Sequence, residues 1–385
     1  MRKKVLILSY SKIDSDPRVL RQIAFFEKLG FEIFLSGLEY QGAYTFFPLQ
    51  KSKNPIFKAY KLGLMLTRQA KLRVKEFLFH SSLKEMMNIE PNLILGNDLE
   101  TWPLAISLRD SNPQARVIFD AHEQYAKEFN DRLSWNWFHK RFIRQVCKRY
   151  IPQADAFTTV CDGIARDYAK DYGVKARLIL NTPDFEHDIF PRPIQGKIKL
   201  VHHGIANRSR KIEKMIRMMD YLGENFELNL ILVPADSNYL DELREISLHK
   251  NINFLPPVPT QDISRFISQF DLGIFLLEPV NFNYKYALPN KFFEFIQARL
   301  AIAIGPSPEM QKIVEMEKIG IVASSFEEEE LAGLILATSP HQLMKMKNNS
   351  DRVARKYSNE QNELVLQDIL YDLGVLEPQT SVLPH

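Results

Sequence analysis

Short apolar runs recur along the chain, and helical patterns separate most of them. The first run is KVLILS at 4–9, and PRVLRQIAFFEKLG follows it, with Pro17 in a first helical turn and Gly30 at the helix stop. Continuous apolar runs of this length are typical of strands that are buried on both faces of a parallel sheet. The first half therefore predicts a doubly wound α/β domain, with further strands at 31–36, 92–95, 116–119 and 176–180 and helices from about 99 and over about 162–172.

The same alternation restarts after a polar stretch that contains Pro183, Pro191 and Pro193. Prolines in a polar setting are typical of an interdomain linker. The sequence predicts two doubly wound Rossmann-like domains, an N-terminal one over 1–183 and a C-terminal one over 197–355, joined by a linker over 184–196. We expect a helical segment over 356–385 to pack back on the N-terminal domain. Open α/β sheets bind ligands beyond the carboxyl ends of their strands, so we expect the chemistry in a cleft between the domains.

The composition is that of a soluble globular protein, with 45% hydrophobic and 25% charged residues in a chain of 385. This length favours two domains, and a net charge of +3 does not require nucleic acid as a partner. Cys147 and Cys161 are too few for a disulfide framework or a zinc site, so we interpret them as packing residues in a reducing compartment. The sequence has no signal-peptide or membrane-span pattern, and we expect a cytoplasmic location.

Polar residues follow two predicted strands of the first half. DAHE at 120–123 comes directly after a buried strand, where His122 can bind hydroxyls or act as an acid or base and Glu123 lies beside it. The alternative for His122 is a capping or packing role. Asp98 is a similar candidate after the strand at 92–95, and its alternative is to cap the next helix.

A basic segment follows the first predicted strand of the second domain. It reads HHGIANRSRK at 202–211, and Gly204 lets backbone approach a ligand. Three cations next to a helix N-terminus suit a diphosphate, and they are Arg208, Arg210 and Lys211. The alternative is a solvated basic face.

A Pro-Asn-Lys turn opens the helix NKFFEF near residue 290. Lys291 and Glu294 are three residues apart, so they lie on one helical face. The carboxylate of Glu294 can accept two ribose hydroxyls, while Asn290, Lys291 and the helix N-terminus hold phosphate. The alternative is a surface ion pair with favourable helix-dipole placement.

Motifs for metals and common cofactors are weak or missing. Asp14-Ser15-Asp16 resembles an Asp-x-Asp metal motif, but Asp16 more simply caps the helix that begins at Pro17. The sequence contains neither a Gly-x-Gly-x-x-Gly fingerprint nor a phosphate-loop motif. We therefore expect no metal and no bound cofactor.

Two segments mix aromatic and basic residues at helical spacing, at 135–149 and at 51–75. A basic amphipathic helix can lie on an anionic membrane surface. The alternative is that the apolar residues face the domain core and the charges face water. The first interpretation predicts a peripheral protein on the inner face of a membrane.

With these residues, the chain resembles the retaining GT-B glycosyltransferases of family 4 over nearly its whole length. SDPRV at 15–19 looks like the opening of that family, DAHE at 120–123 looks like the strand end of its acceptor domain, and PNKFFEFIQARLAIAIGPSPEM at 289–310 is similar to its donor-site helix. The resemblance implies that His122 lies near the transferred sugar and that Glu294 holds the nucleotide ribose. It implies contacts to the donor sugar from Tyr286, Leu288 and Pro289.

Four positions depart from the family pattern. Tyr286 stands where a second glutamate is usual, Ile205 where an arginine is usual, and Arg299 where many members have glycine. Arg210 stands where a phosphate-binding lysine is expected. The departures concern the sugar contact most, since Arg208, Arg210 and Lys291 can still supply charge to a diphosphate.

The resemblance implies a function in glycan or polysaccharide biosynthesis. It predicts transfer of a sugar from a nucleoside diphosphate sugar to a glycan or lipid-linked saccharide, with retention and without a metal. Two alternatives share the same fold: a sugar-nucleotide epimerase, and a binding protein without turnover, which the residues at 205 and 286 favour.

Overall fold

The computed structural model describes residues 2–49, 82–235 and 237–377. The chain forms two compact units: the first contains residues up to Ile179 together with those from Glu363 onward, and the second contains Leu180–Asn362. Residues 184–196, which the sequence indicates as a linker, belong to the second unit. The segment from 356 is divided between the two units.

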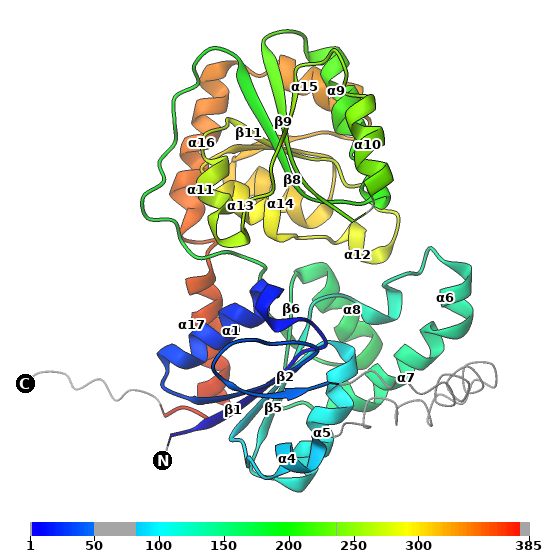
Figure 1. Cartoon of the computed structure of the whole chain (residues 1–385), viewed down its shortest axis with the longest axis vertical. Helices are drawn as coiled ribbons and strands as arrows, with labels where there is room; N and C mark the ends of the chain where they lie inside the picture. The colour runs from blue at the N-terminus through cyan, green and yellow to red at the C-terminus, as the bar shows by residue number, and fades with distance from the viewer. Residues whose placement is uncertain (1, 50–81, 236, 378–385) are drawn as a thin grey trace, which may run out of the picture. The chain divides into compact units, whose positions relative to one another are not determined.

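The first unit is built on a seven-stranded parallel sheet with the strand order β3-β2-β1-β4-β5-β6-β7. Figure 1 shows β1, β2, β5 and β6 of this sheet. Its central strands are buried because apolar residues face both sides of the sheet. The strands are β1 (Lys4–Leu8), β2 (Glu32–Gly37), β3 (Thr45–Pro48), β4 (Leu93–Asn97), β5 (Arg116–Ala121), β6 (Ala156–Thr159) and β7 (Ala176–Leu178). Strands β3 and β6 were not predicted from the sequence.

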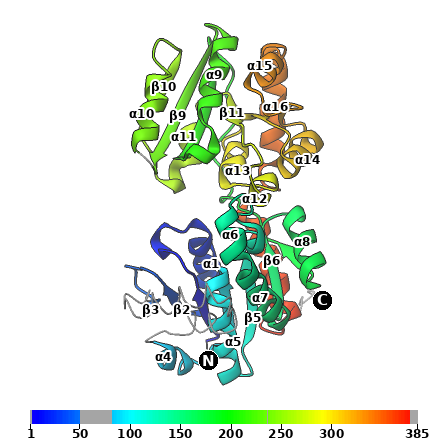
Figure 2. The same ribbon diagram turned by 90° about the vertical axis from the view of Figure 1, so that its right-hand side faces the viewer.

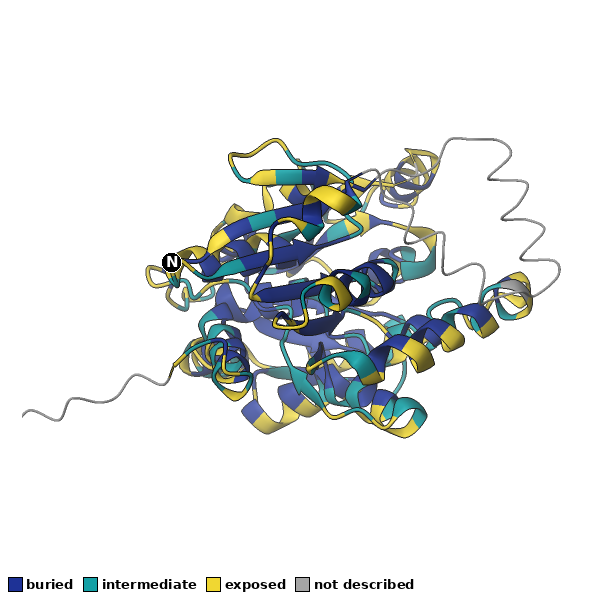
Figure 3. Cartoon of the chain, turned by 90° about the horizontal axis from the view of Figure 1, so that it is seen from below, coloured by how far each residue is buried: buried dark blue, intermediate teal, exposed yellow. Residues whose placement is uncertain are grey.

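Helices with one apolar face cover this sheet. Asp16 caps the first of them, as predicted, because its carboxylate accepts hydrogen bonds from the backbone N–H groups of Arg18 and Val19. The described helices of the unit are α1 (Pro17–Lys28), α4 (Leu83–Met87), α5 (Trp102–Ser111), α6 (Leu133–Phe138), α7 (Lys140–Tyr150) and α8 (Asp162–Tyr172). Figure 3 shows the resulting pattern, in which strands are mostly buried and the outer faces of helices are exposed.

The C-terminal helix α17 (Asn359–Asp372) returns to this first unit. Leu366, Ile369 and Leu370 join one apolar cluster with Val5 of β1 and Phe26 of α1. The first core is therefore completed by residues that are distant in the sequence.

The second unit contains a six-stranded parallel sheet with the order β10-β9-β8-β11-β12-β13. Figure 2 shows α10 beside β10 and β9 at one end of this sheet, with α14 and α16 toward the other end. The strands are β8 (Ile198–Ala206), β9 (Phe226–Pro234), β10 (Ile252–Leu255), β11 (Leu272–Phe275), β12 (Ala301–Ile304) and β13 (Gly320–Val322). The helices are α9 (Glu213–Leu222), α10 (Ser237–Glu245), α11 (Ile263–Ile267), α12 (Phe282–Lys285), α13 (Asn290–Gln297), α14 (Pro308–Glu317), α15 (Glu328–Leu336) and α16 (Pro340–Ala354).

Strand β8 is longer than the sequence predicted. The apolar run ends at Val201, but β8 stays paired with β9 from Ile198 through Ala206. The backbone ladder continues because side-chain polarity does not limit main-chain pairing. The sequence placed His202, His203 and Gly204 after the first strand of the second domain, whereas they belong to the strand itself.

Among the described residues, no helix combines the length and the apolar character that crossing a membrane requires.

Candidate functional site

A buried ion pair organises the end of the first sheet. Arg18 of α1 donates two hydrogen bonds of 2.6 Å to the carboxylate of Asp120 at the end of β5. Thr158 and Gln22 donate to the same carboxylate at 2.6 and 3.0 Å. Burial raises the pKa of Asp120, but the charge of Arg18 and the hydrogen bonds from its neighbours lower it more, so the pKa lies well below its usual range. Asp120 is thus a fixed negative charge.

His122 lies beside this pair, half-buried, at the position that the sequence predicted. Its Nε2 atom is 3.3 Å from Oδ1 of Asn97 and 3.6 Å from Oδ2 of Asp120, and its Nδ1 atom is 3.7 Å from Oδ1 of Asp98. Burial and the charge of Arg18 lower the pKa of His122, but the two carboxylates raise it more, so the net shift is upward from 6.5. The arrangement stabilises an imidazolium, which can donate hydrogen bonds to oxygen atoms.

Asp98 has a different role from helix capping. Its side chain makes no capping hydrogen bond to the 3-10 turn Leu99–Thr101. Instead its Oδ2 atom accepts hydrogen bonds from Tyr10 N–H at 2.7 Å and from the Ser9 hydroxyl at 3.0 Å. Asp98 has a positive φ of 66°, which costs free energy in a residue with a side chain. The structure brings Asp98 and His122, two separate candidates from the sequence, within 3.7 Å of each other.

Two further carboxylates lie in this part of the chain. Glu123 is exposed, and its backbone carbonyl accepts a hydrogen bond from the Tyr168 hydroxyl at 2.8 Å. Burial, together with the charges of Glu123 and Glu100, raises the pKa of Glu128 to about 8. Glu128 was not predicted from the sequence, because nothing in its local pattern marks a carboxyl with a raised pKa.

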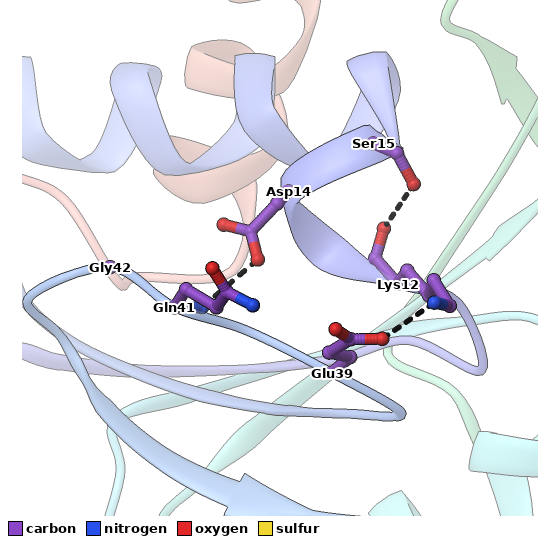
Figure 4. A pocket seen from close by; sticks show the side chains of 6 residues that line it. All are labelled: Lys12, Asp14, Ser15, Glu39, Gln41 and Gly42. Carbon is purple, nitrogen blue, oxygen red and sulfur yellow. Dashed lines mark hydrogen bonds and ion pairs between the residues drawn. The ribbon is translucent and has the colours of Figure 1, made fainter.

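A pocket of about 470 Å³ lies at the loops that follow β1 and β2, and Asp14 and Ser15 of the Asp-x-Asp stretch line it (Figure 4). Lys12 pairs with Glu39 at 2.6 Å, and Gln41 N–H donates to Oδ2 of Asp14 at 2.9 Å. The polar groups of this pocket therefore engage each other. Among the described residues, no group of three or more His, Cys, Asp or Glu side chains is placed to hold a metal ion.

In the second unit, two cations converge on Gly204. A Cβ atom at Gly204 would lie 3.1 Å from Nζ of Lys291 and 3.5 Å from Nη1 of Arg210. Gly204 has a φ of 124°, a conformation that side-chain residues rarely adopt. Lys291 extends from the first turn of α13 and is buried. Burial and the charge of Arg210 hold the pKa of Lys291 well below its usual range, although Glu294 acts in the opposite direction.

Glu294 is also buried on α13, on the same helical face as Lys291. Its Oε2 atom lies 3.4 Å from Nε2 of His203. Within the described residues, this His203 nitrogen makes no hydrogen bond. Burial and the charges of Lys291 and Arg210 hold the pKa of His203 well below its usual range, so the ring is neutral. The surface-pair alternative for Lys291 and Glu294 is wrong, because both side chains are buried.

Two other predicted diphosphate ligands are directed to carboxylates. Arg208 donates to Glu242 at 2.7 and 2.6 Å, and its guanidinium lies 4.9 Å from the ring centre of Tyr239. Lys211 pairs with Glu278, which also pairs with Lys214 at 2.7 Å. Of the three predicted cations in the basic segment, Arg210 is the one that the structure places beside Gly204 and Lys291.

The residues before α13 set the position of its N-terminus. Pro289 is the N-cap residue and Asn290 is the first helical residue. Leu288 is buried, and its carbonyl accepts a long hydrogen bond of 3.5 Å from Asn181. The ring of Tyr286 packs against Phe282 with ring centres 4.8 Å apart.

Arg299 has a φ of 61°, in the left-handed region that favours glycine. Its buried guanidinium donates to Asp351 at 2.7 Å and to the carbonyls of Gln297 and Glu186 at 2.6 and 2.7 Å. The side chain therefore connects α13 to α16 and to the segment that enters the second unit.

The basic segment at 135–149 forms α6 and α7. On α7 the apolar side chains Phe142, Val146, Cys147 and Tyr150 are buried, as the core-facing alternative predicted. Its exposed face carries Arg141, Arg144, Lys148 and Arg149. On α6, Leu133 and Trp137 are 79% and 65% exposed. The other basic segment, 51–75, lies outside the described residues.

Comparisons with known proteins find similarity at the level of structure. No family model matches the sequence, and no curated protein matches it either. Sucrose-phosphate synthase from Thermosynechococcus elongatus is similar with a TM-score of 0.73 at 14% identity, covering 97% of this chain and 100% of that chain. HepE from Anabaena in complex with UDP-glucose is similar with a TM-score of 0.68 at 12% identity, and the match covers 97% of this chain and 100% of HepE. A glycosyltransferase from Rickettsia africae is similar with a TM-score of 0.69 at 10% identity, and the match covers 97% of this chain and 98% of that chain.

These structures share two units of parallel α/β architecture with the chain, and the sheets of seven and six strands agree with that architecture. The predicted fold class is confirmed: the chain has the GT-B fold that is found in these glycosyltransferases.

Proposed function

We propose that the chain is a glycosyltransferase that moves a sugar from a nucleoside diphosphate sugar to a glycan or lipid-linked saccharide. One observation carries the proposal: Lys291 and Arg210 converge on the backbone of Gly204, and Glu294 lies on the Lys291 face of α13. A buried cation needs a compensating anion. A diphosphate beside Gly204 supplies that anion, and a ribose near Glu294 supplies hydroxyl donors.

The structural similarity supports a nucleotide sugar as the donor. HepE was crystallised with UDP-glucose, and its fold matches this chain over nearly its full length. The buried orphan nitrogen of His203 is a second indication, because a ligand hydroxyl near Glu294 would give it a partner.

The proposed reaction breaks the bond between the sugar carbon and the diphosphate oxygen, and it forms a bond from that carbon to an acceptor hydroxyl oxygen. Arg210 and Lys291 neutralise the departing diphosphate, so the proposal needs no metal ion. The resemblance to retaining enzymes supports retention, with the acceptor proton passing to the leaving phosphate. His122, with Asp98, orients hydroxyls by hydrogen bonding and is not a nucleophile. Glu123, which follows His122 directly and is exposed, contributes to acceptor binding in this proposal.

We also propose that the protein works at the inner face of an anionic membrane, where lipid-linked acceptors of polysaccharide synthesis are found. The exposed cations of α7 lie on one helical face, and exposed Leu133 and Trp137 precede them on α6. Cations attract anionic lipid headgroups, and exposed apolar side chains insert at the interface.

A thermal-shift screen with UDP, GDP, ADP and their common sugar conjugates tests donor binding. A ligand that binds only the native state raises the melting temperature. We expect at least one nucleoside diphosphate to stabilise the wild type, and Glu294→Ala to lose the response to all of them. Glu330→Ala, which removes a carboxylate elsewhere in the second unit, should keep the response. No response in the wild type would contradict the proposal.

Tyr286 and Ile205 favour one second candidate, a binding protein without turnover, because they replace a carboxylate and an arginine of the family pattern. Donor binding without hydrolysis or transfer, across a broad panel of sugar acceptors, would support that candidate. Conversion of the donor sugar in the absence of any acceptor would instead identify an epimerase.

A further inference from the structure

His202 is a buried histidine on β8 with a defined tautomer. Its ring is 1% exposed and stacks on Phe275, with ring centres 5.7 Å apart and planes 21° from parallel. Its Nδ1 atom lies 2.9 Å from the carbonyl oxygen of Ile274. A carbonyl oxygen only accepts hydrogen bonds, so Nδ1 carries the proton.

The other ring nitrogen faces Lys291. Nε2 of His202 lies 3.3 Å from Nζ of Lys291. Burial and the charge of Lys291 hold the pKa of His202 well below its usual range, so the ring is neutral and Nε2 has a lone pair. The Lys291 amine must therefore be the donor in this contact.

The Lys291 amine also lies over an aromatic ring. Its Nζ atom lies 4.4 Å from the ring centre of Phe275 and next to the Cβ position of Gly204. An aromatic face attracts a cation but does not fix its direction as a hydrogen bond does. The His202 contact therefore sets where the end of this long, flexible side chain lies.

We propose that His202 is a positioning residue, which accepts a hydrogen bond from Lys291 and holds its amine at Gly204, ready for the donor diphosphate. The proposal rests on the donor-binding function proposed above. The competing view is that His202 only fills space in the core, as buried histidines often do.

Three substitutions separate these views. His202→Asn keeps a donor near Nδ1 for the Ile274 carbonyl, but it is too short to accept from Lys291. His202→Gln places an amide oxygen near the Nε2 position and can accept from Lys291. We expect His202→Asn to weaken nucleoside diphosphate binding roughly ten-fold and His202→Gln to restore it to within about three-fold of the wild type. Asn229→Leu removes another buried polar side chain of this sheet and should lower stability while leaving affinity unchanged.

The test measures dissociation constants for UDP, GDP and ADP by calorimetry, with thermal unfolding to check that each variant is folded. His202→Asn is also measured in a Lys291→Met background, where a residue that acts through Lys291 should have no further effect. Unchanged affinity in His202→Asn, or the same loss in both backgrounds, would overturn the proposal and leave the donor-binding function standing. If the wild type bound none of the three nucleotides, the proposed function would fail and this inference with it.

Discussion

The guanidinium of Arg18 makes two hydrogen bonds of 2.6 Å with the carboxylate of Asp120, and both side chains are buried. Removing one member of such a pair leaves the other charge uncompensated in the interior, which typically costs about 3–5 kcal/mol. We therefore expect Arg18→Met to lower the free energy of unfolding by about that amount, measured by urea denaturation.

Arg208 provides the matched control for this change. It also pairs with a carboxylate through two hydrogen bonds, but Arg208 and Glu242 are both exposed. Exposed pairs contribute about 0–1 kcal/mol, so Arg208→Met should have little effect on stability. Equal losses in the two variants would contradict the assignment of the Arg18 pair as a buried, structure-determining contact.

The raised pKa of His122 predicts how stability depends on pH. The folded state holds the His122 proton more tightly than the unfolded state, so the contribution of the imidazolium is complete below the ordinary pKa of 6.5. It is lost as the pH rises through the higher pKa of the folded state. We expect the stability difference between wild type and His122→Gln to shrink between about pH 6 and pH 9, measured by urea denaturation over a pH series. His341→Gln, at an exposed histidine of α16, controls for the loss of one imidazole. A stability difference between wild type and His122→Gln that grew with pH would contradict the raised pKa of His122.

The exposed cations of α7 predict binding to anionic vesicles. The triple variant Arg141→Glu, Arg144→Glu and Lys148→Glu should lose sedimentation with phosphatidylglycerol-containing vesicles, while wild type should bind them in a salt-dependent way. The triple variant Arg192→Glu, Lys197→Glu and Lys345→Glu makes the same change in net charge at exposed positions of the second unit and should still bind. If both triple variants lost vesicle binding, the net charge of the protein would account for the binding. If both still bound vesicles, α7 would not be part of the proposed membrane-binding surface.

Glycine usually stabilises a position with a positive φ, but we expect Arg299→Gly to destabilise the protein. Arg299→Gly relieves backbone strain of about 1 kcal/mol, but it deletes buried hydrogen bonds from a charged group, worth about 1.5–3 kcal/mol each. We expect the free energy of unfolding to fall by more than about 3 kcal/mol, because the three lost hydrogen bonds outweigh the relieved strain. Lys318→Gly, at an exposed residue with a φ of 57°, should be neutral or slightly stabilising. A stable Arg299→Gly variant would show that the guanidinium contacts contribute little.

The fold was largely predictable because most strands are short apolar runs that the sequence alone reveals. Strand β6 is an exception, since its sequence AFTT contains two threonines. Thr158 is tolerated inside the sheet because its hydroxyl donates to Asp120, a partner that no local pattern reveals. The end of β8 was missed for a related reason, because pairing with β9 continues where the apolar run has stopped.

The site was predictable where a single element determines it. Lys291 and Glu294 share a face of α13 through their spacing alone. The sequence could not show that Arg210, and not Arg208, lies beside Gly204. This depends on Glu242 and Tyr239 of α10, which contact Arg208. His202 was not singled out either, since only the positions of Ile274 and Lys291 distinguish it from a packing residue.

The return of α17 to the first unit affects how the protein is made. The apolar faces of β1 and α1 emerge early from the ribosome, yet Leu366, Ile369 and Leu370, which complete their core, are translated only after the whole second unit. A nascent chain that is arrested before residue 366 therefore carries uncovered apolar surface, which favours aggregation and chaperone binding. The second unit, in contrast, is continuous in sequence and can fold cotranslationally as soon as it has emerged.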